Sequence, residues 1–160
     1  MNVMLSKTFF DNHYLAGEET DFKSKVLRGE KRHTCRANYD FWKKRVDILK
    51  ARQGVLSLRQ WSGKPYQKGS KQEKIIDIAA SVIDVQRLVL RRTQGEKDEI
   101  IRTRGNYTAE VDGTPIDIAT IAYNDGLHVE EFKAWFDPVF EEAGTDALAF
   151  AVIHFTTFRY

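Results

Sequence analysis

The chain has little cysteine: Cys35 stands alone among its 160 residues. A single cysteine excludes an internal disulfide and argues against a cysteine-based zinc site. The four histidines, His13, His33, His128 and His154, lack the short spacing of metal-binding motifs. We therefore expect no metal and no cofactor. A reducing, cytoplasmic setting follows from the low use of cysteine.

Long apolar runs are also missing. None approaches the roughly 20 residues that a membrane-spanning helix needs, and no signal peptide opens the chain, so we expect no membrane partner. Hydrophobic residues make up 42% and charged residues 30%, which is ordinary for a soluble globular protein. With no internal repeat and no low-complexity linker, the length predicts one domain over residues 1–160.

The formal net charge of +2 hides an uneven distribution. Residues 23–74 hold sixteen lysines and arginines against four acids, for a net +12. Residues 75–160 carry a net −7, and the first 22 residues carry −3. Such a polarised chain is suited to attracting phosphate groups. The alternative is that the lysines and arginines merely keep one helix face in water, and the sequence leaves both readings open.

The spacing of apolar residues predicts helices and strands without regular βαβ alternation. Helices are expected at 18–28, 39–52 and 128–136. Strands are expected at 4–10, 55–60 and 149–158, with a hairpin over 107–118 around Asp112-Gly113, two strands or one bent strand within 71–92, and a polar turn at 95–98. This pattern predicts an α+β domain, a mixed β-barrel flanked by a few helices.

Residues 29–36 read Gly-Glu-Lys-Arg-His-Thr-Cys-Arg, with the spacing G-x-K-x-x-T-x-R. A glycine suits the left-handed residue that ends a helix. In an extended strand after it, Thr34 and Arg36 point to one face, and Cys35 points to the other as a core residue. Lys31 would reach over the Thr34 face. The cluster would offer an amine, a hydroxyl and a guanidinium to one polar ligand, unless these are plain solvated turn residues.

This spacing resembles the signature of the ASCH domain, a PUA-like β-barrel family associated with RNA. Two further segments carry the resemblance, residues 56–66 (LSLRQWSGKPY) and residues 124–136, which precede the last predicted strand. The resemblance implies a cleft whose floor carries Lys31, Thr34 and Arg36. It also implies RNA, or a nucleoside or nucleotide, as the ligand.

Some small bacterial ASCH members are amidohydrolases that remove the acetyl group from N4-acetylcytidine with a lysine, a threonine and a glutamate. By this resemblance, Lys31 and Thr34 match the first two positions, and Asp125 stands near the third. Asp125 is one methylene shorter than glutamate, and this chain has extra length before it. The alternative for Asp125 is a turn residue and helix-entry cap.

The chemistry of such a set is coherent. A hydroxyl nucleophile needs a base, and a lysine serves as one when burial or a neighbouring cation lowers its pKa. Arg36 and Arg32 are candidates for that cation, and Arg36 is also a candidate to hold a phosphate or the substrate carbonyl. The carboxylate of Asp125 would return a proton to the leaving amine.

Aromatic residues offer a place for a base. Trp61 and Tyr66 lie in a loop that also bears Lys64, and a stacked base contributes roughly 1–3 kcal/mol. Trp42 is expected in the core because it lies at helical spacing. The resemblance, together with these residues, implies recognition of RNA or a nucleoside or nucleotide in a basic cleft, with deacylation of an N4-acetylcytidine-type nucleoside as the alternative. It leaves the oligomeric state open.

Overall fold

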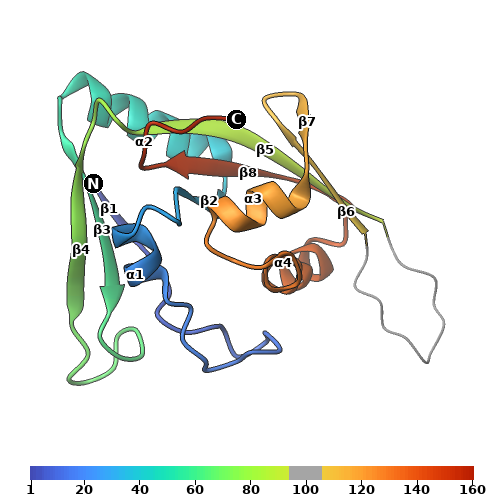
Figure 1. Ribbon diagram of the computed structural model, residues 1–160, viewed down its shortest axis with the longest axis horizontal. Helices are drawn as coiled ribbons and strands as arrows, with labels where there is room; N and C mark the ends of the chain where they lie inside the picture. Colours follow the sequence, from blue (N-terminus) through green and yellow to red (C-terminus); the bar gives the residue numbers. More distant parts are fainter. Residues whose placement is uncertain (94–105) are drawn as a thin grey trace.

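The computed structural model describes residues 1–93 and 106–160 (Figure 1). The elements are β1 (Asn2–Met4), α1 (Phe22–Leu27), β2 (His33–Ala37), α2 (Tyr39–Ala51), β3 (Val55–Trp61), β4 (Gln72–Ala79), β5 (Asp84–Thr93), β6 (Asn106–Val111), β7 (Thr114–Ile116), α3 (Ile118–Asn124), α4 (Val129–Ala143) and β8 (Ala147–His154). No helix among the described residues has the length and apolar character needed to cross a membrane.

The strands form two sheets. In the smaller sheet the order is β1-β3-β4, with β1 parallel and β4 antiparallel to β3. In the larger sheet the order is β2-β8-β5-β6-β7, and every pair is antiparallel. Within the described residues no strand pairing closes these sheets into a barrel. The predicted α+β class is confirmed, the predicted barrel is not found, and the PUA-like assignment stays a prediction.

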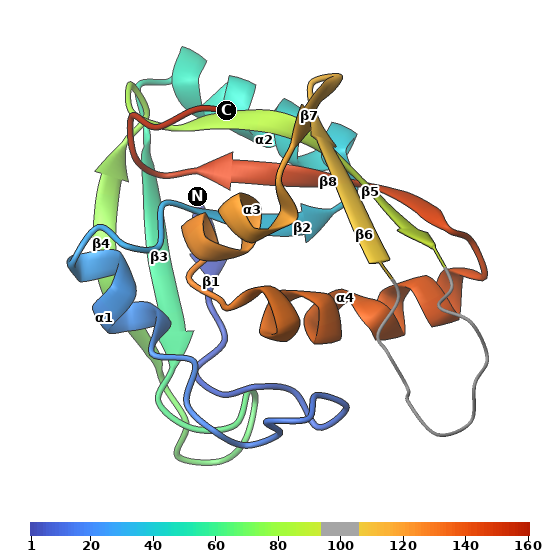
Figure 2. The same cartoon turned by 45° about the vertical axis from the view of Figure 1, so that its right-hand side comes forward.

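The centre of the larger sheet is covered on both faces (Figures 1 and 2). Helix α2 contacts β5 and β8, while α3 and α4 lie on the opposite side of these strands and contact each other. The half of β8 from Phe150 to His154 is buried at every position. Coverage of both faces explains why this strand is a continuous apolar run instead of an alternating one.

Several predicted elements are confirmed. Helix α2 follows the predicted span within a residue, and Asn38 caps it by accepting a hydrogen bond from the backbone N–H of Phe41. The hairpin of β6 and β7 turns on Asp112 and Gly113, whose φ values are 49° and 85°. Two positive φ values in a two-residue loop match the right-handed twist of the paired strands. Trp42 packs against the core but stays half-buried.

Other predictions are wrong in bounds or in kind. The strand expected at 4–10 is β1, which ends at Met4; Leu5 and Phe9 are buried as anchors of a loop. Helix α1 begins at Phe22 and not at residue 18, and α4 continues through Pro138. Helix α3 was not predicted because its seven residues are too short to show helical spacing. The turn expected at 95–98 lies outside the described residues.

Candidate functional site

The start of β2 is fastened to the end of α3, although the two lie far apart in sequence. Gly29, with φ of +75°, ends α1 in the left-handed conformation that the octapeptide predicts. The backbone N–H of Lys31 then donates to Lys25 O at 3.1 Å, and that of Arg32 donates to Asn124 O at 2.7 Å. These bonds bring the lysine of the octapeptide next to Asp125, which follows α3.

Lys31 is buried and paired. Its side chain is 1% exposed, and Nζ donates to both the backbone oxygen and Oδ1 of Asp125. The ammonium also lies over the ring of Phe22, 4.0 Å from its centroid. Because an unpaired ammonium is very unfavourable in an apolar interior, the carboxylate of Asp125 is what allows the lysine to lie here.

Burial shifts the protonation equilibria of this pair in opposite directions. It lowers the pKa of Lys31 and raises the pKa of Asp125, while the attraction between the two groups opposes both shifts. The positive charge of Arg36 lowers the pKa of Lys31 further. The two pKa values therefore move toward each other.

Gly126 gives the lysine side chain room to pass. Its φ of +78° is a conformation that other residues rarely adopt. A Cβ added there would lie 3.1 Å from Cβ and 3.3 Å from Cγ of Lys31. The carbonyl of Gly126 also accepts a hydrogen bond from Lys25 Nζ at 2.8 Å. The glycine thus fixes both the turn and the path of Lys31.

Thr34 and Arg36 form a second pair on β2. Arg36 Nη1 donates to Thr34 Oγ1 at 3.0 Å and to Cys35 O at 2.9 Å, and Nη2 donates to Met4 O. The predicted alternation is confirmed, because Thr34 and Arg36 share one side of the strand. Among the described residues no hydrogen bond joins Lys31 Nζ to Thr34 Oγ1. The expected set of three is therefore two adjacent pairs, Lys31–Asp125 and Thr34–Arg36.

Both pairs line one cavity of about 290 Å³. Strand β2 lies at the edge of its sheet, so the cavity reaches side chains from both of its faces. Much of the remaining wall is apolar or aromatic, and it is formed by Met4, Leu5, Phe10, Phe22, Trp61, Pro65, Tyr66, Leu127, Trp135 and Phe136. A mostly apolar and aromatic lining with a few polar groups is the usual composition of a small-molecule site.

Of the two aromatic residues predicted in the loop, Trp61 is instead the last residue of β3, whereas Tyr66 does lie in the loop that follows. Trp61 and Tyr66 both line the cavity, with ring centroids 5.1 Å apart, and Tyr66 is 90% exposed. The other two predicted ligand-binding residues do not line it in the described part of the chain. Arg32 lies over the ring of Phe158, 5.2 Å from its centroid, and Lys64 is exposed.

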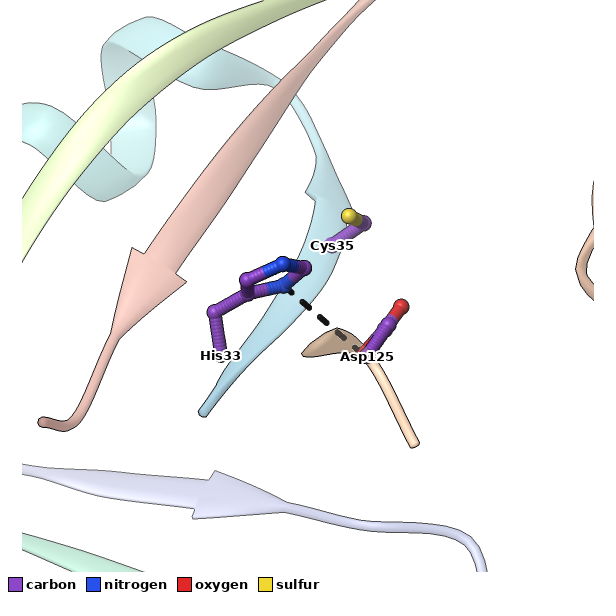
Figure 3. A group of neighbouring side chains, drawn as sticks. All are labelled: His33, Cys35 and Asp125. Carbon is purple, nitrogen blue, oxygen red and sulfur yellow. Dashed lines mark ion pairs between the residues drawn. The ribbon is translucent and has the colours of Figure 1, made fainter. Parts of the chain in front are cut away.

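His33, Cys35 and Asp125 form a cluster that the sequence did not reveal. Figure 3 shows the two β2 side chains and the carboxylate facing one another, and one donor atom from each lies within 4.8 Å of the others. Such atoms are metal ligands in other proteins. Here the ammonium of Lys31 already contacts Asp125 Oδ1, and burial raises the pKa of the Cys35 thiol. Both features oppose a second cation.

Two interpretations from the sequence can now be compared with the structure. Asp125 is not a helix-entry cap: it follows α3 as its C-cap, and His128 caps α4. Cys35 belongs to the core cluster as predicted, and it also lines the cavity. Two further residues at this site, Gly126 and His33, were not predicted from the sequence. The Asp125-Gly126 dipeptide, which is typical of a turn, was the available signal for the first, and no signal marked the second.

Comparison of the chain with protein-family models, with curated proteins and with solved structures finds no match.

Proposed function

We propose that this chain is an amidohydrolase of the ASCH type, which removes the acyl group from an N4-acylated cytosine nucleoside. The observation that supports it best is the buried contact between Lys31 and Asp125 in the wall of a cavity. Thr34 and Arg36 lie in the same wall. The G-x-K-x-x-T-x-R spacing is the reason for proposing an enzyme of the ASCH type.

The nucleophile in this proposal is the hydroxyl of Thr34. Arg36 Nη1 donates to Oγ1, so the hydroxyl proton is not used in that bond and the developing negative charge on oxygen is stabilised. After passing its own proton to Asp125, Lys31 is neutral and takes the proton of Oγ1 as this oxygen attacks the amide carbon. The contact between hydroxyl and amine would form when substrate binds, as catalytic hydrogen bonds often shorten only then.

The remaining steps return the enzyme to its starting state. Arg36 stabilises the oxyanion of the tetrahedral intermediate, as a donor aimed at developing charge does. The protonated Lys31–Asp125 pair gives a proton to N4 as the carbon–nitrogen bond breaks and cytidine leaves. Water then attacks the acyl carbon of the threonine ester and gives a proton to the pair. As the bond between this carbon and Oγ1 breaks, the pair returns that proton to Oγ1, and the carboxylic acid departs with Thr34 restored as the hydroxyl.

The cavity suits this substrate class in size and lining. A volume of about 290 Å³ lies at the small end of ligand sites, which begin near 300 Å³. The Trp61–Tyr66 pair offers aromatic faces for the cytosine ring, and Phe10 and Trp135 lie in the apolar wall available to the acyl group. Membrane contact plays no part in the proposal.

The direct test is turnover of N4-acetylcytidine and its longer-chain acyl analogues, followed by release of cytidine. Thr34→Val and Lys31→Met should abolish turnover, whereas Thr34→Ser should retain part of it because it keeps the hydroxyl. Lys44→Met, on the exposed face of α2, is the matched control and should behave like wild type. Absence of turnover by wild-type protein across the panel would refute the proposal.

A second function is recognition of RNA or a nucleotide without hydrolysis. The observation that favours it is the exposed Tyr66 beside Trp61, in a chain segment with a net charge of +12 between residues 23 and 74. In Figure 1 much of this segment, with α1, β3 and β4, lies at one end of the molecule. Affinity for RNA would then fall steeply with salt, because binding releases counterions. RNA that fails to bind even at low salt would exclude it.

A further inference from the structure

Behind the cavity, polar contacts continue from Asp125 to Tyr160. His33 is fully buried, with 0% of its surface exposed. Its Nε2 lies 2.6 Å from Tyr160 Oη, and its Nδ1 lies 4.0 Å from Asp125 Oδ1 (Figure 3). Within the described residues Nδ1 has no hydrogen-bond partner. A buried nitrogen without a partner requires an explanation, and the carboxylate is the acceptor that it faces.

The neighbours of Tyr160 determine which ring nitrogen carries the proton. Asn124 Nδ2 lies 3.3 Å from Tyr160 Oη, and an amide nitrogen can only donate. The tyrosine oxygen accepts from Asn124, and within the described residues its only other hydrogen-bond contact is His33 Nε2, which is therefore the acceptor for its single proton. A neutral imidazole that accepts at Nε2 carries its proton on Nδ1. The N–H of His33 thus points to the Asp125 side.

The surroundings keep the imidazole neutral and the tyrosine protonated. Burial lowers the pKa of His33, and His154 and Lys31 lower it further. Burial raises the pKa of Tyr160. The ring of His154 lies 5.5 Å from that of His33, and burial lowers its own pKa to about 4, so it adds no positive charge near neutral pH. The charged groups facing His33 are then Asp125 and Lys31.

We propose that His33 is a positioning residue for Asp125: Tyr160 and Asn124 fix the ring as the Nδ1–H tautomer, and this N–H orients the carboxylate toward Lys31. At 4.0 Å the N–H is too far for a hydrogen bond and acts as an oriented dipole. In a low-dielectric interior such a dipole favours the ionised carboxylate. The catalytic consequence of the proposal rests on the proposed function; the tautomer and its effect on Asp125 do not.

The tautomer can be read directly by ¹⁵N nuclear magnetic resonance, from the long-range couplings of the ring protons. Wild-type protein should show His33 as Nδ1–H at neutral pH. In Tyr160→Phe, the Nε2–H form should gain population because the donor to Nε2 is gone. An Nε2–H ring in wild-type protein would overturn the proposal. An unchanged tautomer in Tyr160→Phe would show that the tyrosine does not fix the ring, and would overturn that part of the proposal.

Two replacements of His33 separate orientation from space filling. The amide nitrogen of His33→Asn reaches about the place of Nδ1, and that of His33→Gln reaches about the place of Nε2. Titration of the Asp125 carboxyl by ¹³C resonance should give a higher pKa in His33→Gln than in His33→Asn. Equal values in both variants would show that the ring only fills space, and would overturn the proposal.

Kinetics extend the same comparison. If a displaced carboxylate slows deacylation by about tenfold to a hundredfold, as small misplacements do, His33→Gln should lose this much and His33→Asn less. In His33→Gln the acidic limb of the pH–rate profile should also move to higher pH, because the pKa of Asp125 is expected to be higher in this variant. Wild-type protein without deacylase activity would refute the proposed function, and the carboxyl titration would still decide the role of His33. Tyr160→Phe retains the ring and serves where His33→Gln fails to fold.

Discussion

Removing the charge of Asp125 while keeping its shape tests how the buried pair contributes to stability. In Asp125→Asn the side-chain oxygen and the backbone oxygen still accept from Lys31 Nζ, and the ring of Phe22 stays 4.0 Å away. Only the negative charge is lost. Lys31 is then an ammonium that is 1% exposed and has no carboxylate to balance it.

The size of the effect follows from that burial. Breaking a buried ion pair by removing one partner destabilises a protein by about 3–5 kcal/mol, and the retained acceptors place this variant near 3 kcal/mol. For a chain of this length that corresponds to a melting temperature lower by about 6–12 °C. Urea unfolding of wild-type and variant protein at neutral pH measures the difference directly.

The direction in which stability changes with pH can also be predicted, for the variant and for wild type. Burial lowers the pKa of Lys31 below its ordinary 10.5, and loss of Asp125 lowers it further. Between the folded and unfolded pKa values the unfolded chain binds more protons, so the stability of Asp125→Asn should rise with pH over that window. In wild type the pKa of Asp125 is raised above its ordinary 3.8, so between these two values the folded chain binds more protons than the unfolded chain. Over that window this group makes stability fall as pH rises.

A double-mutant cycle completes the test. Lys31→Met alone leaves the carboxylate buried and should also destabilise, whereas Lys31→Met combined with Asp125→Asn should lie within about 1–2 kcal/mol of wild type. The reasoning is refuted if Asp125→Asn loses less than about 1 kcal/mol, or if the double variant loses the sum of the single ones. Either result would mean that the lysine is not held by the carboxylate.

Three further predictions concern single positions. Gly126→Ala should destabilise the protein by about 1–3 kcal/mol in thermal melts, since its Cβ would lie 3.1 Å from Lys31 Cβ at a φ of +78°; a neutral outcome would contradict the close passage. Trp61→Ala should raise the Michaelis constant for a nucleoside about 5- to 150-fold, equivalent to about 1–3 kcal/mol of stacking, with little change in turnover rate. Cys35 should react slowly with a thiol reagent near neutral pH because it is buried and its pKa is raised, and Cys35→Ala should keep activity; full loss of activity would give the thiol a catalytic role.

The octapeptide could be interpreted from sequence because its information is local. Alternation along a strand places Thr34 and Arg36 on one side, and their hydrogen bond confirms it. The long-range pairing could not be predicted in the same way. Lys31 and Asp125 are 94 residues apart, and only a resemblance suggested that they meet. The partition into two sheets is equally non-local, since β1 pairs in parallel with β3, more than 50 residues along the chain.

The same dipeptide forms two different turns in this chain, because the elements on either side of it differ. Asp112-Gly113 and Asp125-Gly126 are the same dipeptide, and both glycines adopt positive φ. The first lies between short alternating strands and becomes a hairpin turn, whereas the second follows α3 and becomes its C-terminal turn. The aspartate at the hairpin accepts from the backbone N–H of Arg87, while the one after α3 is buried against a lysine. A chemical role for the second aspartate therefore depends on the helix that ends there, and that helix is the element that apolar spacing does not reveal.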